Sequence, residues 1–271
     1  MEPFYLSHSK GRFHGITAGN GPLLLICLHG FGESCHSFEC LETSFAKGYT
    51  LVSIDLPGHG ETGWPGRYFR PEELKEMLVL VLERFGKGKC ILLGYSMGSR
   101  LALCAMQLMP SGISALVLLA PDGLRTNFWH SLATRTWLGN RIFHHFINHS
   151  GQFFGLMRTG RFLGLVNRGV FKFASQKMES REKRQQVYRI WTSMKEMNPS
   201  VSKVRKILLE NHIPLLLIFG KYDQVIPPSW GRRFFGDQPL CEMIVLDRGH
   251  QMLNAETAIL IRQSLDKLIG V

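Results

Sequence analysis

Six short apolar runs, separated by longer amphipathic stretches, constrain the fold of this chain more than any other feature. Each run is apolar almost throughout and is bounded by glycines or prolines, which is typical of strands covered on both faces. The runs span residues 23–30, 49–60, 89–96, 113–123, 213–223 and 241–250. Residues 4–10 and 11–19 alternate more strongly and predict an antiparallel start. Helical patterns at 71–82 and 255–268 complete the alternation, so the sequence predicts an α/β fold with a mostly parallel sheet.

The alternation breaks between residues 123 and 206, a segment too long for one crossover helix. Helical patterns occur there at about 129–147, around Val187, Ile190, Trp191 and Met194, and at about 202–209. We therefore predict two domains. Residues 1–122 and 207–271 form a core, and residues 123–206 form an inserted helical cap.

The formal net charge of +11 is concentrated in the predicted cap. Between Asp122 and Lys206 the chain has sixteen Lys and Arg residues against four Asp and Glu, a balance of +12, and the remainder has a balance of −1. Such asymmetry indicates an anionic partner, either a substrate or a membrane surface. A solvated basic face is the alternative that the charge count leaves open.

The length of 271 residues and the 45% hydrophobic content suit a globular protein with a sizeable core. No apolar run approaches the roughly 18 residues of a membrane span, and the N-terminus lacks the pattern of a signal peptide. The six cysteines show no CxxC pairing. We therefore expect a reduced, cytoplasmic protein.

One serine stands between two glycines where an apolar run gives way to a helical pattern: Gly94, Ser96 and Gly98 form a GxSxG motif. In a nucleophile elbow the serine occupies a strained turn, and the glycines let neighbouring backbone approach closely. The turn places the N–H of Met97 at a helix N-terminus, where it can stabilise negative charge. The motif in this context predicts that Ser96 is a catalytic nucleophile.

A nucleophilic serine needs a base, and the base needs an orienting acid. After an elbow of this type the acid and then the histidine follow in the chain, each just past a strand. Asp223 and His250 stand at the ends of the last two runs, just past their apolar parts, so we predict a Ser96–Asp223–His250 triad. Asp122, near the end of the run at 113–123, is the rival acid.

The sequence LHGFG at residues 28–32 ends the first of the six runs and predicts the second half of an oxyanion hole. Its glycines allow the backbone to turn inward, and the N–H of Phe31 is the expected donor beside that of Met97. We interpret His29 in this loop and His59 in DLPGHG as structural hydrogen-bonding residues.

The stretches LHGFG, DLPGHG, GYSMGS, GKYDQVIP and RGH resemble the signature stretches of the α/β-hydrolase superfamily, over almost the whole chain except the predicted cap. The resemblance implies an eight-stranded, mostly parallel sheet, a lid inserted after the sixth strand, and no cofactor; no metal site is expected. Members resembling haloalkane dehalogenases and epoxide hydrolases carry Asp at the nucleophile position, whereas this chain carries Ser96.

Arg100 lies about one helical turn beyond Ser96, and GYSxGxR resembles the menaquinone-pathway synthase of the same superfamily. That resemblance implies that Tyr95 and Arg100 contact the substrate, the arginine through a substrate carboxylate. The stretch LLAPDGLRTNFWH departs from that enzyme. The alternative is that Arg100 packs behind the elbow and hydrogen-bonds backbone carbonyls.

Residues 151–173 interleave Phe and Leu with Arg, Lys and several glycines. This composition fits an aromatic-lined lid over an apolar acyl pocket, an interfacial surface for anionic lipid, or a helical lid with solvated charges. Arg158, Arg161 and Arg168 are the basic residues expected nearest to a bound acyl chain. No motif for nucleic acid is present, so nucleic acid is not an expected partner.

Together these features predict a carboxylesterase- or lipase-like serine hydrolase that cleaves the carboxylic ester of a small-molecule acyl substrate through an acyl-enzyme. A thioester or an amide is the alternative substrate. Lyase-type elimination, as in the menaquinone-pathway synthase, is the alternative reaction. A non-catalytic binding module of the same fold is the alternative that involves no chemistry.

Overall fold

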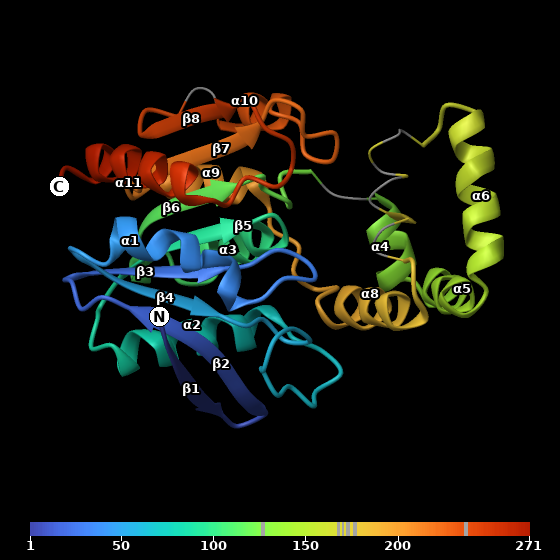
Figure 1. Cartoon of the computed structure of the whole chain (residues 1–271), viewed down its shortest axis with the longest axis horizontal. Helices are drawn as coiled ribbons and strands as arrows, with labels where there is room; N and C mark the ends of the chain where they lie inside the picture. Colours follow the sequence, from blue (N-terminus) through green and yellow to red (C-terminus); the bar gives the residue numbers. More distant parts are fainter. Residues whose placement is uncertain (126–127, 167–168, 170, 172–173, 176–177, 236–237) are drawn as a thin grey trace. The chain divides into compact units, whose positions relative to one another are not determined.

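The computed structural model describes residues 1–125, 128–166, 169, 171, 174–175, 178–235 and 238–271. The chain divides into two compact units (Figure 1). The core unit comprises residues 1–125 and 197–271, and the helical unit comprises residues 126–196. The helical unit is therefore a single insertion into the chain of the core unit.

The core unit is built on one eight-stranded sheet with the order β1-β2-β4-β3-β5-β6-β7-β8 (Figure 1). β1 pairs antiparallel with β2, β2 pairs antiparallel with β4, and the other neighbours are parallel. The strands are β1 Glu2–His8, β2 Gly11–Ala18, β3 Leu23–Leu28, β4 Tyr49–Ile54, β5 Cys90–Tyr95, β6 Ile113–Leu119, β7 Leu215–Gly220 and β8 Cys241–Leu246. The predicted α/β fold with a mostly parallel sheet is confirmed.

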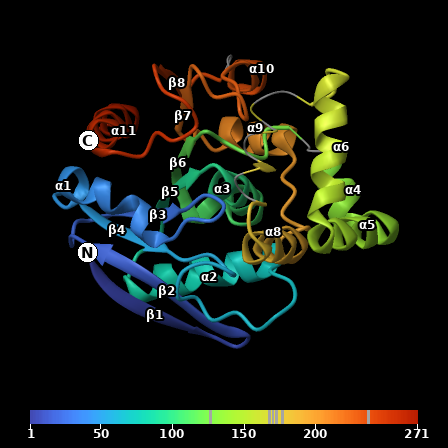
Figure 2. The same cartoon turned by 45° about the vertical axis from the view of Figure 1, so that its right-hand side comes forward.

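Helices cover both faces of this sheet (Figures 1 and 2). On one face η1, α1 and α11 contact one another, and on the other α2, α3 and α9 pack in a row. These elements and the two remaining ones are η1 Cys35–Leu41, α1 Glu42–Phe45, α2 Pro71–Arg84, α3 Met97–Leu108, η2 Pro110–Gly112, α9 Val201–Glu210, α10 Ser229–Phe235 and α11 Ala255–Ile269. Among the described residues, no helix is both long enough and apolar enough to cross a membrane.

Local sequence signals explain where two of these helices begin and end. α2 starts with a proline, and the Glu73 carboxylate accepts a 2.6 Å hydrogen bond from the backbone N–H of Arg70, as in a capping box. At α11 the Asn254 side chain accepts the N–H of Thr257 at 3.0 Å. Gly270 ends that helix with a φ of +74°, a conformation that favours glycine.

The central strands are buried on both faces, as their continuous apolar runs predict. Every residue of β4, β5 and β7 is buried. Phe38, Phe45 and Tyr49 are fully buried in the same apolar cluster as Ile261 and Leu265 of α11. Burial of apolar surface contributes about 25 cal/mol per Å² to the stability of a fold, so this cluster holds η1, α1 and α11 against the sheet. Ser96 and Asp223 lie in the turns that follow the carboxyl ends of β5 and β7, and His250 lies in the loop that follows β8.

The helical unit, where it is described, consists of α4 Phe128–Arg135, α5 Trp137–Asn148, α6 Ser150–Phe162 and α8 Arg181–Ser193. Its small core lies between α5 and α8. The Phe143 ring is centred 5.3 Å from that of Tyr188 and 5.6 Å from that of Trp191, and Ile147 and Ile190 are buried. α6 buries no side chain, so it is the least anchored of the four described helices.

The helical unit lies within the predicted cap of residues 123–206 and is shorter at its C-terminal end. α9 packs against α3 and α10 in the core unit, because its apolar face, with Val204 and Leu208, is almost fully buried. That the helical unit acts as a cap stays a prediction. Arg168 lies outside the described residues.

Candidate active site

Ser96 lies on a strained turn between β5 and α3. Its backbone has a φ of +51° and a ψ of −114°, a combination that residues with side chains rarely adopt. A Cβ at Gly98 would lie 1.8 Å from the Leu28 carbonyl oxygen, and a Cβ at Gly94 would lie 2.5 Å from the Cα of Ser99. Close backbone approach therefore requires glycine at both positions, as the sequence predicts for a nucleophile elbow.

His250 links Ser96 and Asp223 in a continuous line of hydrogen bonds. Its Nε2 lies 3.0 Å from Ser96 Oγ, and its Nδ1 lies 2.7 Å from Asp223 Oδ2. The other Asp223 oxygen accepts the backbone N–H groups of Val225 and Ile226 at 2.8 and 2.9 Å, which fixes the carboxylate. With Nδ1–H donating to Asp223, Nε2 accepts the Ser96 hydroxyl proton. The structure thus brings together the three residues that the sequence predicts as a triad.

Solvent exposure changes along this line of residues. The Asp223 side chain is fully buried, whereas the His250 side chain is 23% exposed, and Ser96 is partly exposed. Charges interact more strongly where water is excluded. The buried carboxylate can therefore stabilise a protonated imidazole, while the serine end of the line stays accessible to a small molecule.

Asp122, the rival acid, has a different partner. Its Oδ2 lies 2.6 Å from a guanidinium nitrogen of Arg100, and its backbone N–H donates to the carbonyl of Ser96 at 3.2 Å. Arg100 also packs on Gly123, where an added Cβ would lie 3.2 Å from the Arg100 side chain. This arrangement favours the packing alternative for Arg100, with a carboxylate as its partner. Contact of Arg100 with a substrate stays a prediction.

Tyr95, the other predicted substrate contact, is buried beside His250. Its hydroxyl donates to the backbone carbonyl of His250 at 3.0 Å, and the two rings are centred 5.8 Å apart at 31°. Burial raises the pKa of Tyr95 above its ordinary value, and the charges of Glu33 and Asp223 add to that effect. The hydroxyl is therefore a hydrogen-bond donor that ties the end of β5 to the loop carrying His250.

The loop predicted to form the oxyanion hole is held by two buried histidines. His29 accepts the N–H of Leu56 at Nε2 (3.0 Å) and bonds the carbonyl of Gly30 through Nδ1 (2.8 Å). His59 accepts the N–H of Gly32 at Nε2, also at 3.0 Å. Burial lowers the pKa of His29 to about 4 and that of His59 to about 3. Both rings are neutral at pH 7 and bond backbone groups, in agreement with the structural role predicted for them.

The two expected oxyanion donors belong to elements that the structure holds firmly. Met97 is the first residue of α3, so its N–H lies at a helix N-terminus beside Ser96. The ring of Phe31 packs edge-on against His59, with centroids 6.0 Å apart. Glu33, which sequence analysis did not identify, accepts the N–H of Gly30 at 3.0 Å. Its signal was the short GFGE spacing, which places a carboxylate three residues after a turn glycine.

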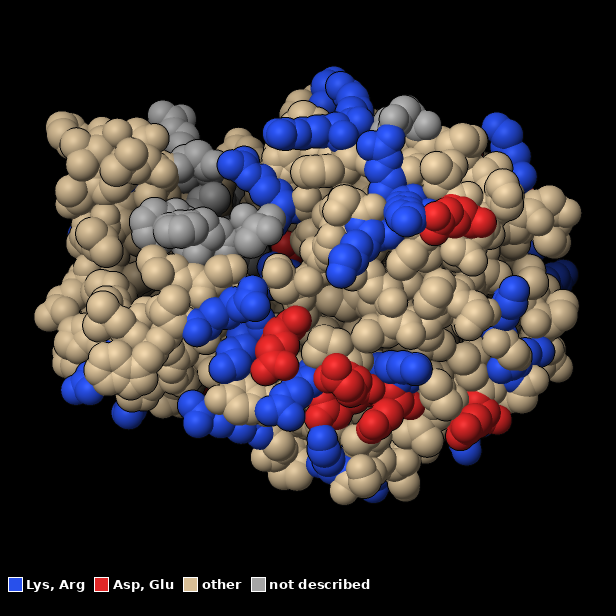
Figure 3. All heavy atoms as spheres, turned by 180° about the vertical axis from the view of Figure 1, so that it is seen from behind, with Lys and Arg blue, Asp and Glu red and all other residues tan. Residues whose placement is uncertain are grey.

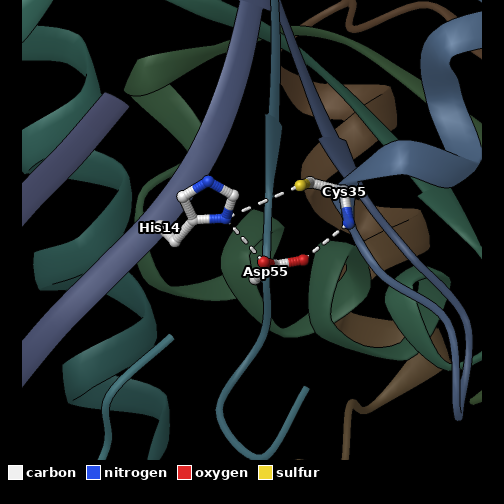
Figure 4. A group of neighbouring side chains, drawn as sticks. All are labelled: His14, Cys35 and Asp55. Carbon is white, nitrogen blue, oxygen red and sulfur yellow. Dashed lines mark hydrogen bonds and ion pairs between the residues drawn. The ribbon is translucent and has the colours of Figure 1, made fainter. Parts of the chain in front are cut away.

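One cluster among the described residues has a composition suited to a metal ion: His14, Cys35 and Asp55 (Figure 4). Asp55 Oδ2 lies 2.7 Å from His14 Nδ1 and accepts the N–H of Glu61 at 2.9 Å. Asp55 Oδ1 accepts the N–H of Cys35 at 2.7 Å. The Cys35 sulfur lies 3.8 Å from His14 Nδ1. The cluster joins β2, the end of β4 and the start of η1.

Its electrostatics suit a structural latch better than a metal site. Burial raises the pKa of the Cys35 thiol far above its ordinary value, and a metal needs the thiolate. Burial also acts to raise the pKa of Asp55, but the hydrogen bonds from Cys35, His14 and Glu61 outweigh it and lower that pKa. Both carboxylate oxygens already have donors, so no step of chemistry is assigned to this cluster.

Comparisons with known proteins agree with this fold. A family model described as "alpha/beta hydrolase fold" matches residues 24–252. A solved structure, a thermophilic esterase from Thermogutta terrifontis, superimposes with a TM-score of 0.71 at 18% identity and covers 99% of each chain. At this identity the likeness to the solved structure concerns the fold.

Two curated relatives extend the comparison to sequence. Pimeloyl-[acyl-carrier protein] methyl ester esterase of Klebsiella pneumoniae (strain 342) is 26% identical over 219 residues, which are 78% of this chain and 79% of the relative. The dihydrolipoyllysine-residue acetyltransferase component of the acetoin cleaving system of Pseudomonas putida is 24% identical over 266 residues, 91% of this chain. The chain spans 63% of the length of that second relative.

Proposed function

The chain belongs to the alpha/beta hydrolase fold family, and on that premise we propose that it is a serine hydrolase that cleaves a carboxylic ester through an acyl-enzyme. The observation that carries the proposal is the line of hydrogen bonds from Ser96 through His250 to Asp223, at 3.0 and 2.7 Å. Family membership supports an enzyme, and the line of hydrogen bonds supports nucleophilic chemistry.

In the proposed acylation step, Ser96 Oγ attacks the carbonyl carbon of the ester as His250 Nε2 takes the hydroxyl proton. Asp223 holds the imidazole in orientation and stabilises its positive charge. The N–H groups of Phe31 and Met97 receive the negative oxygen of the tetrahedral intermediate. As the intermediate collapses, the C–O bond to the alcohol breaks, and the alcohol leaves with the proton from His250.

Deacylation repeats these steps with water. His250 takes a proton from the water as its oxygen attacks the acyl carbon, and the same two N–H groups receive the oxyanion. Collapse of this second intermediate breaks the bond to Ser96 Oγ, which recovers its proton from His250. The products are an acid and an alcohol, and no cofactor or metal enters the cycle.

An ester is the preferred substrate class because the Klebsiella relative is named as a methyl ester esterase. An acyl thioester would react through the same intermediates. Turnover rates measured on an oxygen ester and on a thioester with the same acyl chain distinguish these two substrate classes. We expect the oxygen ester to be the one that is turned over.

Lyase-type elimination is less well supported. In the menaquinone-pathway synthase that GYSxGxR resembles, the arginine is expected to bind a substrate carboxylate. Here Arg100 is paired with Asp122 at 2.6 Å, so a substrate carboxylate would have to displace that partner. Release of pyruvate from the menaquinone precursor would favour the lyase and contradict the proposal.

The primary test is covalent labelling of the full chain with a fluorophosphonate probe, together with turnover of p-nitrophenyl esters of increasing chain length. We expect labelling and turnover in the native protein and loss of both in Ser96→Ala, which removes only a hydroxyl. Ser264→Ala on α11 is the matched control and should keep both. An unlabelled, inactive native protein would indicate a binding module instead.

A further inference from the structure

The helical unit contains a long stretch with no carboxylate. Between Asp122 and Glu179 the chain has no Asp or Glu, but it has eight Lys and Arg residues. All of α5 and α6 falls within this stretch, and the surface that these two helices form shows no acidic side chain in Figure 3. Positive charge in this part of the chain is therefore uncompensated by acids nearby in sequence.

The end of α6 combines this charge with exposed apolar side chains. We call residues 158–165 the α6 tip. Phe162 is 90% exposed, Leu163 61% and Leu165 80%, and Arg158 and Arg161 are also exposed. Scattered apolar residues are normal on a protein surface, but three large ones within four positions of the chain are a patch.

The α6 tip is an ordered turn. Gly164 has a φ of +73°, and the N–H of Leu165 donates to the carbonyl of Gly160 at 2.8 Å, as in a glycine-terminated helix end. The backbone thus holds the apolar side chains in place without burying them. A preformed tip loses little conformational entropy when a partner covers it.

The start of α5 also combines exposed apolar side chains with an arginine. Trp137 is 75% exposed, with the Arg141 guanidinium carbon 5.5 Å from the centroid of its ring, and Leu138 is 61% exposed. Trp prefers the boundary between lipid and water because its ring is apolar and its N–H is polar.

We propose that the α6 tip docks the protein on an anionic phospholipid bilayer. Phe162, Leu163 and Leu165 enter the boundary between headgroups and acyl chains, while Arg158 and Arg161 contact lipid phosphates. An anionic bilayer can contact the apolar side chains and the arginines of the α6 tip at the same time. An acidic peptide would satisfy only the arginines, and a second copy of this chain would bring arginine against arginine. This inference does not depend on the proposed chemistry at Ser96.

The test is flotation of the full chain with vesicles of phosphatidylcholine, with or without about 30% phosphatidylglycerol. We expect binding to the anionic vesicles that weakens as salt rises from about 0.05 to 0.5 M. Phe162→Ser/Leu165→Ser should reduce partitioning by about 10-fold or more. Arg158→Gln/Arg161→Gln should reduce it about 5-fold per arginine on anionic vesicles and leave binding to pure phosphatidylcholine unchanged.

Matched controls lie on the surface of the core unit. Ile259 is 52% exposed on α11 and Lys206 is exposed on α9, so Ile259→Ser and Lys206→Gln should bind vesicles like the native protein. Ser96→Ala should also bind normally, which separates this proposal from the proposed function. Failure of the native protein to float at low salt would overturn the proposal, as would equal flotation of the α6-tip variants and the controls. Self-association in the absence of lipid that the α6-tip variants abolish would identify a second copy as the occupant instead.

Discussion

The candidate active site and the α6 tip differ in how completely their side chains find partners. Polar groups of the site are hydrogen-bonded, whereas apolar side chains of the α6 tip are exposed. In the core unit, the carboxylate of Asp223 is fully buried and bonds His250 and two backbone N–H groups. Among the described residues, every buried side-chain nitrogen or oxygen has a partner. At the α6 tip, Phe162 and Leu165 remain largely in water. The first arrangement fixes the orientation of the Asp223 carboxylate and the His250 imidazole, whereas the second leaves free energy to be gained if the apolar side chains are covered.

The charges of the two units follow the same division. Residues 126–196 carry twelve Lys and Arg against three Asp and Glu. Basic and acidic side chains are more evenly mixed in the core unit, where pairs such as Arg100 with Asp122 and Arg262 with Asp266 form. The groups proposed to react therefore lie in the core unit, and the residues proposed to contact a membrane lie in the helical unit.

The largest expected effect comes from the orienting acid of the core site. Asp223→Asn should lower kcat by about 10⁴-fold, because the amide favours the wrong imidazole tautomer. Asp122→Asn is the matched control. It should cost far less, because Asp122 is bonded to Arg100 and not to His250. Ester turnover measures both, and the opposite ranking would move the acid to Asp122.

Acid should destabilise the core unit through its buried histidines. The pKa of His29 falls to about 4 on burial against about 6.5 for a free side chain. Between these two pH values, the His29 side chain is therefore protonated in the unfolded state and neutral in the folded state. Stability is fully present above about pH 6.5 and declines as the pH falls, by about 3 kcal/mol for His29 alone near pH 4.

Urea unfolding midpoints measured between about pH 7.5 and 4.5 check this expectation. The exposed His36 is the control position, and His36→Gln should leave the pH dependence as it is in the native protein. A midpoint that does not move over this range would contradict the buried, neutral state of His29 and His59.

A smaller effect should come from the Tyr95 hydroxyl. Tyr95→Phe removes the hydrogen bond to the His250 carbonyl, which is worth about 1 kcal/mol, and should lower kcat about 5-fold with little change in KM. Tyr49→Phe is the matched control, because its hydroxyl bonds Asp266 at 2.6 Å on an element that carries no site residue. Equal loss of activity in both variants would mean that Tyr95 acts only through stability.

The smallest expected effect concerns the positive charge of the helical unit and its influence on the rate of ester cleavage. If that charge attracts an anionic substrate, kcat/KM for an anionic ester should fall a few-fold between about 0.05 and 0.5 M salt. A neutral ester of equal length should change little, because apolar burial is not screened. Arg158→Gln/Arg161→Gln should flatten the dependence. Identical salt profiles for the two esters would mean that the positive charge of the helical unit is only solvated and does not affect catalysis.

The elbow and the strands could be read from the sequence because their causes are local. Gly94 and Gly98 are dictated by backbone atoms that would otherwise clash. Continuous apolar runs become buried parallel strands because both of their faces are covered. The order of Ser96, Asp223 and His250 could be predicted for a similar reason, since each residue follows the end of its own strand.

The pairing of polar side chains that are distant in the chain could not be predicted from the sequence in this way. The sequence offered two aspartates for one histidine, and only packing shows Asp223 on His250 and Asp122 on Arg100. The bond from the Tyr95 hydroxyl to the backbone carbonyl of His250 is another such pair, and contact of Tyr95 with a substrate stays a prediction. Such pairs lie many residues apart in sequence, so their geometry depends on how the strands cross over. Short-range sterics and periodicity are encoded within a few neighbouring residues, whereas the partner of a polar side chain is set by the whole fold.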